Sequence, residues 1–193
     1  KALAGLGPYD EPMIQTIIGT LDGNPHTLFF SGPWTIQNNL TLSSLYNVKM
    51  GSSAISNITS NSLLTINGQV ESSLRQRIFN CSSGSTVRFG NRSQVASVMW
   101  FGAVVFDASA SPLYTVPGPS QNKYFQLAHD AYPLKLVVPT GDFLLGKQDP
   151  LYWYACDVEG QENAVIHVGS CWPGVGEGGE AAILVGIDKN KQP

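Results

Sequence analysis

Short runs of β-branched, aromatic and other apolar residues recur through the first half of the chain. Most runs are followed by Gly, Asn or Ser, as strands bounded by tight turns are. The runs occupy residues 27–30, 34–36, 40–42, 46–50, 54–58, 63–66, 77–79, 86–89 and 95–99. Strands this short and this closely spaced pair only if the chain keeps turning back onto itself. The pattern therefore predicts a coiled ladder of strands.

The same rhythm returns in the second half, after a loop and one helix. Residues 108–122 are rich in Ser, Pro and Gly, which indicates a loop or linker. Apolar residues recur at helical spacing from Tyr124 to Ala131, and Pro133 ends the predicted helix. Further strand-like runs follow at residues 135–138, 142–145, 151–154, 164–168 and 182–187, without a strict sequence repeat.

A parallel β-helix explains these features together. One coil takes about 20 residues or more, and its inward side chains stack on those of the next coil. An open end would expose unpaired backbone, so the rod requires a cap. The helix at residues 122–132 is the predicted cap, and residues 1–25 are a second candidate, with one helical turn or an edge strand at residues 13–18.

The predicted fold class is therefore all-β, with coils of a parallel β-helix and a short capping helix. We expect three regions: a lead-in or attachment segment at residues 1–25, a first ladder at 26–107, and a loop, helix and second ladder at 108–193.

The order of several segments resembles the N-terminal part of right-handed parallel β-helix proteins of the pectate-lyase-like superfamily, especially phage tailspikes. The segments that carry the resemblance are residues 30–36, 40–42, 63–71, 77–79, 87–91 and 99–103. A helix and a strand ending in Pro139-Thr140-Gly141 follow, as in that family. The family usually has an aspartate-rich segment after the Trp-Phe-Gly-Ala sequence, and residues 104–109 lack it here.

The resemblance implies a homotrimer in the tail of a virion. Its implied partners are phage tail or adaptor proteins and host cell-surface polysaccharide. Polysaccharide cleavage in such proteins lies on later coils or between subunits, so this chain would be the neck or shoulder of a spike. We therefore expect a virion structural protein that mediates attachment. The alternatives are a secreted polysaccharide lyase or glycosidase on the same scaffold, and a sugar-binding module without catalysis.

The amino-acid composition further limits the classes of binding partner. Charged residues make up 13% of the chain, about half the usual share. Ser, Thr, Asn and Gln must then supply the polar surface, as they do in sugar-facing proteins. The net charge of −3 and the lack of a basic stripe argue against nucleic acid. No apolar run approaches the roughly 18 residues of a membrane span.

Cysteine and histidine spacing predicts no metal and no cofactor. Cys81, Cys156 and Cys171 are too few and too uneven for a disulfide framework, although Cys156 and Cys171 could pair if adjacent turns stack them. No paired Cys or His spacing suggests a zinc site.

The candidate sugar-binding residues are Tyr152, Trp153 and Tyr154. Aromatic faces stack on sugar rings by dispersion. On a strand, Tyr152 and Tyr154 would share one face and Trp153 would lie on the other. The alternative is that these rings stack inside the coil or at a subunit contact.

Carboxylates offer a weaker candidate for catalysis. Glycoside hydrolysis needs two facing carboxylates. Asp157 and Glu159 are separated by one residue, so on a strand they would lie on one side and could share a proton or hold a cation. A solvated strand end is the favoured interpretation. Asp142 follows Gly141 and is predicted to be a turn residue.

The histidines are predicted to be structural. Adjacent residues on a helix point in different directions, so Asp130 is not expected to orient His129, which should interact with the helix C-terminus instead. His167 lies in an apolar run and is predicted to be a core or edge-strand histidine.

Overall fold

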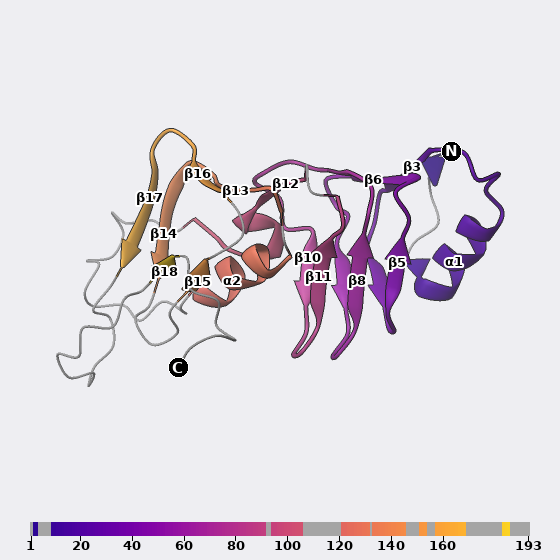
Figure 1. Ribbon diagram of the computed structural model, residues 1–193, viewed down its shortest axis with the longest axis horizontal. Helices are drawn as coiled ribbons and strands as arrows, with labels where there is room; N and C mark the ends of the chain where they lie inside the picture. Colours follow the sequence, from indigo (N-terminus) through magenta and orange to yellow (C-terminus); the bar gives the residue numbers. More distant parts are fainter. Residues whose placement is uncertain are drawn as a thin grey trace.

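A computed structural model of the chain describes residues 2–3, 9–91, 94–105, 121–131, 133–145, 151–153, 157–168 and 183–185. The chain winds into a parallel β-solenoid of about five turns. Figure 1 shows the coils following one another along the long axis, with the N-terminus at one end. Every strand pairing within the described residues is parallel, so the predicted fold class is confirmed.

Five coils contribute three strands each. They are β3 (His26–Phe30), β4 (Trp34–Ile36) and β5 (Leu40–Leu42); β6 (Tyr46–Met50), β7 (Ser56–Ile58) and β8 (Leu63–Ile66); β9 (Val70–Glu71), β10 (Phe79–Cys81) and β11 (Thr86–Phe89); β13 (Lys135–Val138), β14 (Gly141–Leu145) and β15 (Leu151–Trp153); and β16 (Asp157–Gly160), β17 (Ala164–Val168) and β18 (Ile183–Val185). Two short strands, β1 (Ala2–Leu3) and β2 (Tyr9–Asp10), precede them. The coil between β11 and β13 holds β12 (Val95–Ser97), the 3-10 helix η1 (Val98–Phe101) and helix α2 (Asn122–Asp130).

The strands stack coil upon coil into flat sheets. The sheet orders are β1-β3-β6-β9, β10-β7-β4-β2, β11-β8-β5, β12-β13-β16, β14-β17 and β15-β18. Trp34 lies opposite Ser56, and Ser56 lies opposite Phe79, which are steps of 22 and 23 residues. The expected coil length is therefore confirmed. The step from Val95 to Lys135 is 40 residues, because that coil also contains η1, α2 and the residues between them.

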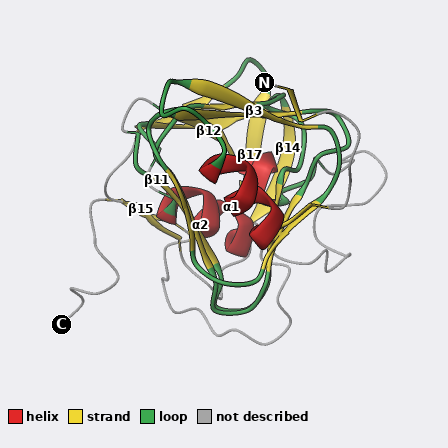
Figure 2. Ribbon diagram, turned by 90° about the vertical axis from the view of Figure 1, so that its right-hand side faces the viewer, coloured by secondary structure: helices red, strands yellow, loops and turns green. Residues whose placement is uncertain are grey.

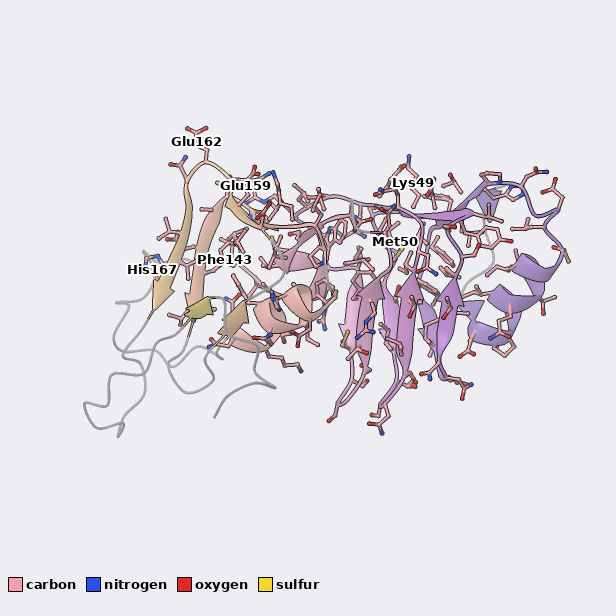
Figure 3. The ribbon with its side chains drawn as sticks, in the orientation of Figure 1. Lys49, Met50, Phe143, Glu159, Glu162 and His167 are labelled. Atoms are coloured by element: carbon pink, nitrogen blue, oxygen red, sulfur yellow. The ribbon has the colours of Figure 1, made fainter. Side chains whose placement is uncertain are left out.

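The core is a set of apolar columns that run along the rod. Alternate residues of each strand are buried, as in β5, where Leu40 and Leu42 are buried and Thr41 is exposed. Leu42, Ile66 and Phe89 occupy one column in successive coils. Figure 3 shows the alternation on β6, where Lys49 points outward and Met50 inward. Burial of such columns is the main favourable term in folding.

Helix α1 (Glu11–Gly19) covers the N-terminal end of the rod. The Asp10 side chain accepts a hydrogen bond from the Met13 backbone N–H at 3.0 Å, which is the usual helix N-cap contact. Figure 2, viewed from this end, shows α1 across the middle of the coil. Ile14 is buried against the core, and a helix therefore occupies the segment that the sequence left open between a helical turn and an edge strand.

The predicted helix in the second half is confirmed, but its predicted role as a cap is wrong. Helix α2 lies within the stack, where it takes the place of a strand between β11 and β15 (Figure 1). Phe89 N–H donates to the Ala131 carbonyl at 2.7 Å, and Gln121 N–H donates to the Leu144 carbonyl at 3.3 Å. Phe125 is fully buried. The helix thus continues the core instead of closing it.

Candidate functional site

A row of amide and hydroxyl side chains lies on the outer face of β4, β7 and β10. Asn57 lies opposite Thr35 and Asn80, one coil away on either side. Asn80 Nδ2 donates to Asn57 Oδ1 at 3.0 Å. We call Thr35, Asn57 and Asn80 the outer row. Its members are about 4.8 Å apart, the spacing of neighbouring strands.

Arg77 fixes the orientation of the outer row. Its Nη2 donates to Asn80 Oδ1 at 2.6 Å, so the Asn80 amide nitrogen must face Asn57. Asn57 Oδ1 accepts that bond, and no acceptor lies within hydrogen-bond distance of Asn57 Nδ2 among the described residues. The row therefore offers at least one oriented amide donor to solvent or to a ligand.

A hydrogen-bonded Asp–His pair lies on the outer face of β14 and β17. Asp142 Oδ1 is 2.6 Å from His167 Nε2, and the two side chains are 35% and 23% exposed. The pair is diagonal, because His167 lies opposite Leu144. Figure 3 shows His167 on β17. A carboxylate in this position holds the imidazole ring in one orientation, as a general base requires.

Sequence reasoning missed this pair. His167 lies on an edge strand, which was one of its two predicted roles, but Asp142 belongs to β14 and not to a turn. Gly141, with φ at +130°, precedes it and makes the turn into the strand. The two residues are 25 apart in sequence, which is one coil plus two positions. An alignment of successive coils at their repeat length would have placed the two residues on neighbouring strands.

The paired carboxylates Asp157 and Glu159 lie on β16, and both are exposed. Lys135 of β13 lies opposite Asp157 and its Nζ contacts Glu159 Oε2 at 2.5 Å. That hydrogen bond raises the pKa of Lys135, and the charge of Asp157 adds to the effect. The arrangement is that of a solvated ion-pair cluster, and it resembles the Lys49–Glu71 pair of β6 and β9.

The prediction that the side chains of His129 and Asp130 point away from each other is wrong. His129 Nδ1 lies 3.2 Å from Asp130 Oδ1, although the residues are adjacent on α2. Gln126, one turn earlier, donates to the same carboxylate oxygen at 2.7 Å and holds it over the helix. The His129 side chain is 1% exposed, so a polymer in solvent does not reach it.

The predicted aromatic site is described only in part. Tyr152 and Trp153 lie on β15, opposite Leu184 and Val185 of β18, which confirms the strand. Their side chains and Tyr154 lie outside the described residues, as do Cys156 and Cys171. The role of this cluster in sugar binding stays a prediction. Cys81 is buried on β10 as a free thiol, and burial raises its pKa.

No group of three or more His, Cys, Asp and Glu side chains is close enough to hold a metal ion in the described part of the chain. The described helices are also too short and too polar to cross a bilayer. Comparison with protein-family models, with curated proteins and with solved structures finds no match. The function must therefore be argued from the solenoid and its surface.

Proposed function

We propose that this chain is a rod-like part of a trimeric phage tailspike or tail fibre that attaches the virion to host surface polysaccharide. The observation that carries the proposal is the parallel solenoid with apolar columns inside and the outer row of hydroxyl and amide groups outside. Such groups recognise the hydroxyls of a sugar chain by hydrogen bonds that need no net charge.

A stacked solenoid also suits mechanical attachment. Each coil is held to the next by parallel backbone hydrogen bonds and by the core columns. Contact groups on successive coils are therefore fixed relative to one another, so the protein side loses little conformational entropy when a polymer binds along them. Trimerisation would place three such faces around one axis and multiply a weak affinity.

The proposal is tested by mass in solution and by glycan binding. Analytical ultracentrifugation of the chain should give a trimer, and affinity electrophoresis in gels that contain host surface polysaccharide should show retardation. Electron microscopy with an antibody against the chain should label the virion tail. A stable monomer that binds no polysaccharide and is absent from virions would contradict the proposal.

A polysaccharide lyase or glycosidase is the second candidate, and the Asp142–His167 pair favours it. Incubation with host polysaccharide would then release reducing ends or unsaturated uronates. His167→Gln should abolish that release. His26→Gln is the matched control, because His26 Nε2 makes the same kind of contact with Asp22, at 2.9 Å, on an exposed turn. Equal activity in the wild type and in His167→Gln would exclude this catalytic role.

A further inference from the structure

The strand ladder of the rod is interrupted at the same level on all three faces. The sheets β1-β3-β6-β9, β10-β7-β4-β2 and β11-β8-β5 each end at the coil that holds β9, β10 and β11. The sheets β12-β13-β16, β14-β17 and β15-β18 begin beyond that coil, and no strand pairing among the described residues joins them to the first three. We call β1 to β11 the N-terminal stack and β12 to β18 the C-terminal stack.

Each face has a different connection where its ladder stops. Beside β9, the side chain of Gln94 takes the place of a strand. Beside β10 lies η1, and Ile78 N–H donates to the Trp100 carbonyl at 3.0 Å. Beside β11 lies α2 (Figure 1), and Phe89 N–H donates to the Ala131 carbonyl at 2.7 Å. Apart from the connecting turn, these are the two backbone-to-backbone hydrogen bonds between the stacks in the part of the chain that the structure describes, whereas β3 and β6 alone are in register over five residue pairs.

Side chains also join the two stacks. The ring centroids of Phe79 and Phe101 are 5.1 Å apart, and those of Phe89 and Trp100 are 6.4 Å apart. Trp100 Nε1 donates to the Ser73 carbonyl at 2.8 Å. Apolar contacts are not directional, so the aromatic rings keep the core continuous without fixing a register as a strand ladder does. The boundary therefore depends on side chains, and the contacts within each stack depend on backbone and side chains together.

We propose that this boundary is a joint in the fold, across which the N-terminal and C-terminal stacks unfold as two separate cooperative units. The stability of a solenoid is approximately the sum of the stabilities of its repeats and of the contacts between neighbouring repeats. Parts of a protein that are weakly coupled open independently of one another. One stack can then open under load or in denaturant while the other keeps its structure. The inference concerns the fold itself and does not depend on the proposed function.

The test follows hydrogen exchange of the full chain by mass spectrometry, over a series of urea concentrations below the unfolding midpoint. Leu64→Ala shortens a fully buried side chain on β8, and Leu145→Ala makes the same change on β14. Leu64→Ala should speed exchange of the slow amides of β6 and β7 about thirtyfold or more, the factor expected for a buried leucine. The slow amides of β13 and β14 should change by less than about threefold. Leu145→Ala should give the reverse result.

Two outcomes would overturn the joint. Equal acceleration of exchange in both stacks by either variant would show that the rod unfolds as one unit. Acceleration in neither stack would show that the slow amides do not exchange by the opening of a stack. If either variant does not give the wild-type circular dichroism spectrum, Ile66→Val and Val138→Ala decide, because they remove fewer atoms from buried positions. Each should speed exchange about twofold or more in its own stack and leave the other stack at the wild-type rate.

Discussion

The side chain of Gln94 replaces a stretch of backbone in the sheet, and its removal is the sharpest test of the fold. Gln94 is 2% exposed and lies just before β12. Its Oε1 accepts from Val70 N–H at 2.7 Å, and its Nε2 donates to the Val70 and Val95 carbonyls at 3.2 and 2.6 Å. Its own carbonyl accepts from Leu134 N–H at 2.8 Å. One residue thus joins the coil of β9 to the coil of β13.

Gln94→Ala should destabilise the protein strongly. Val70 is 5% exposed, so its N–H and carbonyl would lose their partner with little access to water. An unsatisfied buried polar group costs about 1–3 kcal/mol, and two such groups give an expected loss of about 2–5 kcal/mol. Most domains are stable by only about 5–15 kcal/mol, so this loss is a large fraction of the total. Gln94→Glu keeps the shape but removes the Nε2 donor and buries a charge, so it should cost at least as much.

Urea unfolding followed by circular dichroism measures this loss. Gln37→Ala is the matched control, because the Gln37 side chain is exposed and makes no hydrogen bond in the described part of the chain. The free energy of unfolding of Gln37→Ala should differ from that of the wild type by less than about 0.5 kcal/mol. Hydrogen exchange should also show faster exchange of the Val70 amide in Gln94→Ala. A Gln94→Ala protein as stable as the Gln37→Ala control would refute the reasoning.

Three further predictions follow from local contacts. Gly68→Ala places a Cβ against the Tyr46 backbone carbonyl of the neighbouring coil, closer than van der Waals contact allows. We expect a loss of about 1–3 kcal/mol in the free energy of unfolding and a lower melting temperature. An unchanged melting curve would contradict the contact. Phe30→Ala removes a fully buried side chain and should lower the free energy of unfolding, measured in urea, by about 3–5 kcal/mol. A loss below about 1 kcal/mol would argue against the core described here. Hydrogen bonds from the Asn24 side chain, and then from His26, lower the pKa of Asp22. Its stabilising effect should be present above its ordinary pKa and disappear as the pH falls through the lower folded value; an NMR titration of the carboxyl group with an ordinary midpoint would disprove this.

The solenoid could be predicted from sequence because its signal is local. A coil needs only two or three inward residues on each strand, and runs such as Leu40-Thr41-Leu42 display them within three positions. The helical spacing from Tyr124 to Ala131 was equally local. The place of α2 inside the stack could not be predicted, since it depends on hydrogen bonds to Phe89 and Leu144, which lie far from it in sequence.

The surface contacts were missed for the same reason. Sequence reasoning looked for chemistry between residues close in sequence, such as Asp157 and Glu159. In a solenoid the nearest outward neighbour is one coil away, as for Asn57 and Asn80 at a separation of 23. The partner of Glu159 is accordingly Lys135, at a separation of 24. Only the register between coils, which long-range packing sets, reveals these pairs.

Helix α1 packs beside β2 and β4 on the N-terminal side of the coils. The carboxylate of Glu11 accepts from the Gln37 and Asn38 N–H groups at 3.1 and 2.7 Å, just after β4 ends, and so ties the helix to the coil beneath it. The strands β1 and β2 at this end are only two residues long, too short to recruit another chain well. Unpaired strand edges are where β structures recruit further strands. A covered edge is one of the ways in which β proteins avoid edge-to-edge association, and α1 supplies such a cover here.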